Sequence, residues 1–366
     1  MAILSFNLNG YYAFTALFVL YVFIPLMENN LPKNSYNFNK IEKKLAKEDK
    51  FYDWILYLLV PLHLYTAYVF LITISNPEIA TSELVIYSLT MGTILGVNGI
   101  NGGHELGHKT DHPFKLFLAH VLLTTSMQNH FMTYHNSGHH RDVATPNDLT
   151  TAKKGDIFYV FAFKSQIGGY FKTWRLESEK LKIKGKNQLL NPMIIHTILP
   201  WSMIGGIYII FGFDVALFYF LASVFGISIL EAQNYFSHYG LTRKQNEDGT
   251  YEKVKAIHSW NSDHIFGRII LFELTRHSDH HYMGGKAYQI LESKEESPML
   301  PYGYPAMLIL SYFPFFFRPI MEKQLKLYGK YENYFSFNMP LAKAASHQIM
   351  ALRRGEGDKI LRLKIS

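Results

Sequence analysis

Long apolar runs without a formal charge constrain the fold of this chain more than any other feature. They cover residues 10–27, 54–76, 84–103 and 187–230, and only Asp214 interrupts the last run. A helix needs about 20 apolar residues to cross a bilayer, so the last run is long enough for a hairpin of two helices. The pattern predicts an all-α, polytopic membrane protein with about five transmembrane helices. We expect them at about residues 10–27, 54–76, 84–103, 191–212 and 214–231.

Lysines distinguish the two sides of the predicted membrane protein. The segment 28–53 carries Lys33, Lys40, Lys43, Lys44, Lys47 and Lys50, whereas residues 77–83 contain neither lysine nor arginine. The positive-inside rule therefore places the first of these segments in the cytoplasm. Tracing the helices onward puts the chain from residue 104 on the same side. We expect one membrane-embedded domain over residues 1–366, with cytoplasmic catalytic parts at 104–190 and 232–366.

Residues 116–134 also lack a formal charge, but hydroxyl, amide and imidazole side chains dilute their apolar character. A sixth membrane-spanning helix here would place the histidine clusters of the chain on opposite sides of the bilayer. We therefore expect an interfacial or buried helix in this stretch.

Nine histidines fall into three tight clusters and one single position. They are His104 and His108; His135, His139 and His140; His277, His280 and His281; and His238. Residues three or four apart share one face of a helix. The spacing therefore lets His104 with His108, His135 with His139, and the last cluster each direct several ring nitrogens toward one place.

So many imidazoles on one side of a membrane indicate a metal site. Imidazole suits Fe, Zn and Cu, and nine ligands exceed what one ion accepts, so two metal ions are predicted. A hydrolytic zinc site needs only three protein ligands, and we favour iron because an all-nitrogen dinuclear site suits oxygen chemistry. Ionisable groups beside apolar spans are costly unless they are paired or bound to metal.

Four carboxylates within or beside the clusters are candidates to support the metal ligands. A metal-bound imidazole usually donates its other N–H to an acceptor, and Glu105, Asp148, Glu231 and Asp279 occupy suitable positions, as does Asp142. Asp148 also suits a turn or helix cap after Pro146. The histidines outside the clusters are expected to be hydrogen-bonded structural residues.

The absence of cysteine and the net charge of +7 limit the possible partners. Without cysteine this chain has no thiolate metal site or iron–sulfur cluster, so electrons for a redox reaction must come from another protein. The lysines are expected to face anionic lipid, and no motif typical of nucleic-acid binding accompanies them. The first apolar run lacks a basic leader and a cleavage site, so we expect a retained span.

The histidine motifs resemble those of the integral-membrane alkane 1-monooxygenases, within the histidine-rich group of membrane di-iron hydroxylases and desaturases. The motifs are His104-Glu105-Leu106-Gly107-His108, His135-Asn136-Ser137-Gly138-His139-His140, Asn234-Tyr235-Phe236-Ser237-His238-Tyr239-Gly240 and Arg276-His277-Ser278-Asp279-His280-His281. The similarity covers about residues 20–322, and the third motif separates alkane hydroxylases from the wider group.

This resemblance implies two iron ions held by the nine histidines and O2 as the oxidant. It implies terminal hydroxylation of a medium-chain alkane taken from the bilayer. Electrons would come from rubredoxin and an NAD(P)H-dependent rubredoxin reductase, and the active site would face the cytoplasm at a bacterial inner membrane. The chain departs from the family at Tyr134 and Ser237, where acidic residues are common, and it is expected to have five spans instead of six.

Two alternatives stay open at this point. A related hydroxylase or desaturase would act on xylene-like aromatics or acyl chains with the same metal chemistry. A metal or proton transporter would use histidines as relay groups and would place them within the spans, where only His63 and His196 lie in charge-free stretches.

Overall fold

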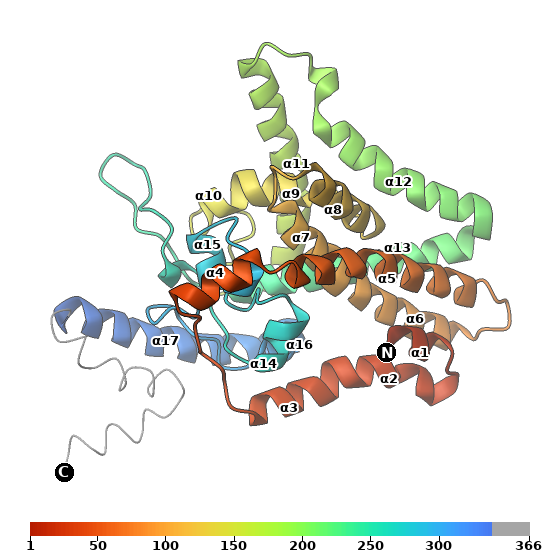
Figure 1. Cartoon of the computed structure of the whole chain (residues 1–366), viewed down its shortest axis with the longest axis horizontal. Helices are drawn as coiled ribbons and strands as arrows, with labels where there is room; N and C mark the ends of the chain where they lie inside the picture. Colours follow the sequence, from red (N-terminus) through yellow and green to blue (C-terminus); the bar gives the residue numbers. More distant parts are fainter. Residues whose placement is uncertain (339–366) are drawn as a thin grey trace.

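The computed structural model describes residues 1–338 as an assembly of helices (Figure 1). Five helices are long and apolar enough to cross a membrane, so the predicted all-α, multi-pass fold class is confirmed. In residues 1–338 the only β-structure consists of isolated bridges, such as the one between Gln245 and Tyr251. The predicted catalytic part 232–366 extends beyond the described residues, because 339–366 lie outside them.

The five candidate spans follow the apolar runs closely. They are Gly10–Asn30, built from η1 (Gly10–Phe14), α2 (Thr15–Phe18), η2 (Val19–Phe23) and α3 (Ile24–Asn30); α5 (Phe51–Ile74); Thr81–Gly107, built from α6 (Thr81–Ile94), η3 (Leu95–Ile100) and α7 (Asn101–Gly107); α12 (Pro192–Phe211); and α13 (Phe213–His238). The third and fifth helices run past their expected ends at residues 103 and 231. Their last turns carry His104 and His238, which are buried and therefore belong to packed helix ends instead of loops.

The third and fifth spans pack closely because glycines face each other. A Cβ atom on Gly92 would lie 2.5 Å from the carbonyl oxygen of Ala222, and one on Gly226 would lie 2.8 Å from the carbonyl oxygen of Gly92. Such small residues let helix backbones approach in a membrane, where apolar burial between helices contributes little. This contact fixes the two helices that carry His104 and His238.

The fourth span, α12, is the most exposed of the five. Only 11% of its most apolar window is buried, compared with 61% for Thr81–Gly107. It projects from the remaining helices and returns through α13 (Figure 1), and Ile209 and Ile210 near its end are largely exposed. On a helix long and apolar enough to cross a membrane, such an exposed apolar surface is suited to contact lipid.

Shorter helices surround the ends of the spans. They are α1 (Ala2–Phe6), α4 (Lys40–Glu48), α8 (Pro113–Thr125), α9 (Phe131–Tyr134), η4 (His135–His139), α10 (His140–Asp142), α11 (Phe158–Ile183), η5 (Gln188–Leu190), η6 (Ala256–His258), α14 (Ile265–Ile270), α15 (His277–Tyr282), η7 (Tyr288–Ile290), α16 (Tyr304–Ser311) and α17 (Pro314–Asn338). The stretch 116–134 is not one helix, because the chain turns between α8 and α9 with a positive φ of 56° at Met127. Helix α8 contacts α7 and η3 and so supports the end of the third span.

Candidate metal centre

The nine clustered histidines come together in two adjoining groups of imidazoles. The first group contains His104, His108, His135, His140 and His280, and the second contains His139, His238, His277 and His281. Within each group, one ring nitrogen from every histidine lies within 4.8 Å of all the others. The rings of His140 and His281, which belong to different groups, have centroids 4.5 Å apart. The structure thus builds a pair of neighbouring nitrogen-rich sites.

In the first group, the distances between neighbouring Nε2 atoms match those between ligand atoms on one metal ion. Nε2 of His104 lies 2.9 Å from Nε2 of both His135 and His108, and Nε2 of His140 lies 2.9 Å from Nε2 of His135. A neutral ring nitrogen offers either one proton or one lone pair, so hydrogen bonds cannot satisfy this chain of contacts. Metal–nitrogen bonds of about 2.0–2.1 Å place adjacent ligand atoms about 3 Å apart. The geometry fits a bound metal ion.

The second group has the same spacing. Nε2 of His277 lies 3.1 Å from Nε2 of His238 and 3.1 Å from Nε2 of His281. In the described part of the chain, the buried Nε2 atoms of His139 and His280 have no hydrogen-bond partner. A buried nitrogen without a partner is destabilising, and a metal ion in each group would satisfy these atoms.

A π-helical turn decides how the second cluster is divided. Residues His135–His139 form the π-helix η4, in which hydrogen bonds join residues five apart. The i, i+4 spacing predicts that His135 and His139 share one site. Instead, His135 and His140 belong to the first group and His139 to the second, because the wider turn aligns residues 135 and 140.

Burial keeps these rings neutral and available to bind metal. Transfer out of water, together with the neighbouring imidazoles, lowers the pKa of His135, His140, His277, His280 and His281 well below the usual value. A neutral ring presents a lone pair without first losing a proton. The donor set is therefore ready for a metal ion near neutral pH.

Asp148 is the carboxylate that directly supports a histidine of the centre. Its Oδ2 atom lies 2.8 Å from Nδ1 of His139, and Thr150 and Thr151 also donate to its carboxylate. Burial opposes ionisation of Asp148, but its contacts with His139 and the threonines outweigh burial and lower the pKa of Asp148 below its ordinary value. The anion orients His139 so that Nε2 faces the second group.

The other candidate carboxylates lie nearby but engage different partners. Asp279 accepts a hydrogen bond from Lys286 Nζ at 2.6 Å and from the backbone N–H of Glu292 at 2.8 Å. Glu105 is buried one residue from His104 and accepts a hydrogen bond from the backbone of Tyr288. These two carboxylates therefore accept hydrogen bonds from the backbone around the centre and not from an imidazole. Asp142 pairs with Arg141 and Lys172 at the surface.

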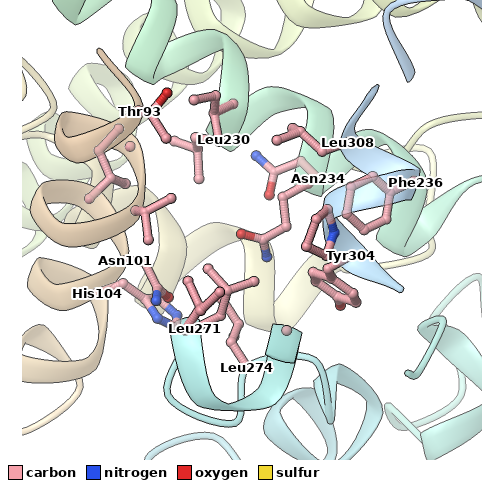
Figure 2. A pocket seen from close by; sticks show the side chains of 18 of the residues that line it. Thr93, Asn101, His104, Leu230, Asn234, Phe236, Leu271, Leu274, Tyr304 and Leu308 are labelled. Atoms are coloured by element: carbon pink, nitrogen blue, oxygen red, sulfur yellow. The ribbon is translucent and has the colours of Figure 1, made fainter. Parts of the chain in front are cut away.

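An apolar cavity leads from the spans to the metal centre (Figure 2). His104, His135 and His277 line its inner end, so the cavity reaches both histidine groups. Along the third span it extends from Thr93 to His104, a helical rise of about 16 Å. None of the described residues that line it is Asp, Glu, Lys or Arg. The cavity is therefore suited to an elongated, uncharged molecule.

Comparison with known proteins identifies the wider family. A sequence model described as fatty acid desaturase matches residues 81–311, which contain all nine histidines. The chain belongs to the fatty acid desaturase family.

Several members of the fatty acid desaturase family resemble this chain along most of its length. It is 35% identical to a protein named alkane 1-monooxygenase 1 from Alcanivorax borkumensis, over 84% of this chain and 76% of the relative. It is also 35% identical to an alkane 1-monooxygenase from Ectopseudomonas oleovorans, over 84% of this chain and 77% of the relative. A xylene/toluene monooxygenase hydroxylase component, XylM, from Pseudomonas putida is 24% identical over 88% of this chain and 85% of the relative. The predicted resemblance to alkane 1-monooxygenases is confirmed.

The two positions at which this fatty acid desaturase family member departs from the expected motifs are both buried near the centre. The hydroxyl of Tyr134 lies 3.1 Å from Asp148 Oδ1 and accepts a hydrogen bond from the backbone N–H of Leu149 at 3.2 Å. Ser237 Oγ lies 3.2 Å from the hydroxyl of Tyr304. Tyr134 thus steadies Asp148, which holds His139, although sequence reasoning treated it only as a lost acidic group.

Sequence reasoning also missed Thr150 and Thr151. Their hydroxyls donate to the Asp148 carboxylate at 2.7 and 2.6 Å. Their position two and three residues after an aspartate is typical of local side-chain turns, and this spacing could have revealed them. Asn101, a polar residue that lines the apolar cavity, has no comparable local signal.

Proposed function

We propose that this protein is an alkane 1-monooxygenase that uses O2 to convert a medium-chain n-alkane into the primary alcohol. The observation that carries this proposal is the uncharged cavity that ends on His104, His135 and His277. Relatives named alkane 1-monooxygenase at 35% identity support the same activity.

The cavity suits an alkane because it binds by apolar contact alone. Burial of each methylene contributes about 0.8 kcal/mol, so a chain of several methylenes binds without a polar group. Leu230, Leu271 and Leu308 surround the space in Figure 2, while His104 marks its inner end. An alkane dissolved in the bilayer would enter with its terminal carbon toward the histidines.

Each part of the protein has a distinct task in this reaction. Two iron ions, one held by each histidine group, would supply the activation of O2. Asp148 and Tyr134 keep the His139 ring in its binding orientation through the hydrogen bonds described above. The apolar lining excludes water and holds the terminal carbon beside the histidines, which favours reaction at the chain end.

We infer that the electrons reach the centre from an electron-transfer partner, because these 366 residues contain no cysteine for an iron–sulfur or rubredoxin-type centre. We infer that rubredoxin supplies them and that an NAD(P)H-dependent rubredoxin reductase reduces it. The lysines of segment 28–53 support a cytoplasmic location of the centre, at the inner membrane of a bacterium.

The second candidate is hydroxylation of a methyl group on an aromatic ring. The match to XylM, a xylene/toluene monooxygenase component, favours it. An acyl substrate is less suited to the cavity, because none of the described residues that line it is a lysine or arginine that could receive a carboxylate.

Metal content and product analysis test the proposal together. The purified protein should contain close to two iron ions per chain, and zinc or no metal in folded protein would contradict the di-iron site. With rubredoxin and its reductase, octane should give 1-octanol as the main product. A ring-methyl alcohol from xylene as the main product, or an alkene from a fatty acid, would replace the alkane assignment.

A further inference from the structure

A second cavity reaches the two histidine groups from another side, at His135 and His139, and polar side chains line it. Its polar lining includes Gln128, His130, Tyr134, Ser165, Glu231 and Asn234, and His135 and His139 also border it. Its free space accepts about one water molecule, and a buried water needs about two to four polar partners, which this lining supplies. We call this space the polar chamber.

Glu231 is the acidic group of the polar chamber. It lies on α13 with only 3% of its surface exposed, and in residues 1–338 no lysine or arginine forms an ion pair with it. Its carboxylate contacts the side chains of Ser165 and Asn234, and Nδ2 of Asn234 lies 3.4 Å from Glu231 Oε2. An unpaired carboxylic acid inside an apolar span is costly and commonly marks a proton relay.

Asn234 and His135 line both cavities, so the polar chamber and the apolar cavity meet at the metal centre. Glu231 itself contacts no histidine of the two metal groups in the described structure. The polar chamber lies between Glu231 and the centre, since His135 and His139 border it together with Glu231. The titratable groups that face this space are His130, Tyr134, His135, His139 and Glu231.

Polar side chains also connect the polar chamber with the start of α12. The His130 ring packs edge-on against Tyr170 with centroids 5.2 Å apart, and the Tyr170 hydroxyl lies 2.7 Å from Thr197 Oγ1. Beside Thr197, the ring of His196 stacks on that of His120 at 5.2 Å. His196 is about one helical turn from the first residue of α12, so this group lies near the end of the span.

The proposed reaction requires protons at the centre. One oxygen atom of O2 enters a C–H bond to form the alcohol, and the other leaves as water, which takes up two protons and two electrons. The electrons come from a one-electron carrier protein. Among the described residues, none that lines the apolar cavity is a carboxylate, whereas Glu231 lines the polar chamber.

We propose that the polar chamber delivers protons to the metal centre, with Glu231 as the residue that takes up a proton from the His130 side and passes it through water toward His135 and His139. This inference rests on the proposed monooxygenase activity. It assigns a role to His130, Tyr170 and Glu231 that binding of the metal ions does not require.

The experiment compares Glu231→Gln with Glu231→Asp and with Glu28→Gln in the full-length protein. Glu28 is a matched control because it is also a buried carboxylate at the end of a span, where it accepts a hydrogen bond from the backbone of Gly267. Iron content is measured first in every variant. Glu231→Gln should keep its iron but lose about 100-fold in alcohol formation, with continued O2 consumption that yields hydrogen peroxide. Glu231→Asp should restore much of the alcohol, and Glu28→Gln should leave the ratio of alcohol to O2 unchanged.

A second readout does not depend on turnover. Infrared difference spectra between the oxidised and chemically reduced iron forms should show a carboxyl band that shifts in D2O. The band should persist in Glu28→Gln and disappear in Glu231→Gln. If wild-type protein forms no alcohol from any substrate, the proposed function fails, and the infrared band still decides whether Glu231 exchanges a proton.

If iron-loaded Glu231→Gln keeps the wild-type ratio of alcohol formed to O2 consumed and the wild-type carboxyl band, the proposal is overturned. If Glu231→Gln does not retain iron, His130→Gln takes its place, because His130 borders the polar chamber without belonging to either metal group. Peroxide in place of alcohol in His130→Gln supports proton delivery through the polar chamber. A wild-type ratio of alcohol to O2 in that variant refutes it.

Discussion

Asp148 holds the ring of His139 through a buried hydrogen bond, with Oδ2 of the carboxylate 2.8 Å from Nδ1 of the imidazole. Tyr134, Thr150 and Thr151 complete the hydrogen bonds of the same carboxylate. The pair therefore fixes one histidine of the four-histidine group from the side that faces away from the other three, and it links this group to the loop after α10.

Replacement of Asp148 by asparagine should weaken metal binding in the second histidine group. The neutral amide stabilises the His139 ring less than a carboxylate does, and loss of such a support typically costs about 10–100-fold in metal affinity. Titration of the apoprotein with Fe(II) measures this change. Asp142→Asn is the matched control, since Asp142 pairs with Arg141 and Lys172. Equal iron affinity in both variants would show that the Asp148–His139 contact does not support metal binding.

Val97→Phe should lower the maximum chain length of the alkanes that the protein accepts. Val97 lines the apolar cavity seven residues before His104, a helical rise of about 10 Å. An extended carbon chain advances about 1.2 Å per bond, so alkanes longer than about eight carbons should lose turnover while shorter ones keep it. Product profiles for a series of alkanes measure the effect. Val85→Phe, at a 47% exposed site on α6, should retain the wild-type profile.

Gly92→Ala should destabilise the protein by separating the third and fifth spans. The added Cβ would lie 2.5 Å from the carbonyl oxygen of Ala222, a backbone atom that cannot move aside alone. Overpacking of this kind costs about 1–3 kcal/mol, and thermal unfolding in detergent would record it as a lower transition temperature. Gly206→Ala on α12 meets no atom within 4 Å and should leave that temperature unchanged or higher.

Acid should destabilise the protein through His264, which is buried outside the spans and hydrogen-bonded to Ser262 at 2.8 Å. Burial, assisted by the charge of Lys33, lowers the pKa of His264 to about 4 from its usual 6.5. Between these values only the unfolded chain binds the proton. The free energy of unfolding should therefore fall as pH decreases from 6.5 to about 4, by at most about 1.4 kcal/mol per pH unit from this residue.

Chemical unfolding at a series of pH values measures this dependence. His264→Asn should flatten the slope over that range. A slope that is identical in His264→Asn and in the wild type would rule out His264 as a source of the acid sensitivity.

The sequence by itself determined the helical membrane fold and the choice of nine histidines as candidate metal ligands. Apolar runs of about 20 residues leave a helix as the stable form in a bilayer, and one histidine cluster begins at His104, directly after the run 84–103. The resemblance of the four motifs to those of alkane 1-monooxygenases could also be recognised from local sequence alone, because each motif lies within a short continuous segment.

Only the tertiary structure decided how the histidines are divided between two groups. His135 pairs with His140 because η4 is a π-helix, although the i, i+4 rule pairs it with His139. Asp279, next to His280 in sequence, is held by Lys286 instead of by an imidazole. Helical periodicity defines the face on which a side chain lies, but the ring or carboxylate that it meets belongs to a distant segment. Those partners, and the two cavities that meet at Asn234 and His135, arise from packing between helices far apart in the chain.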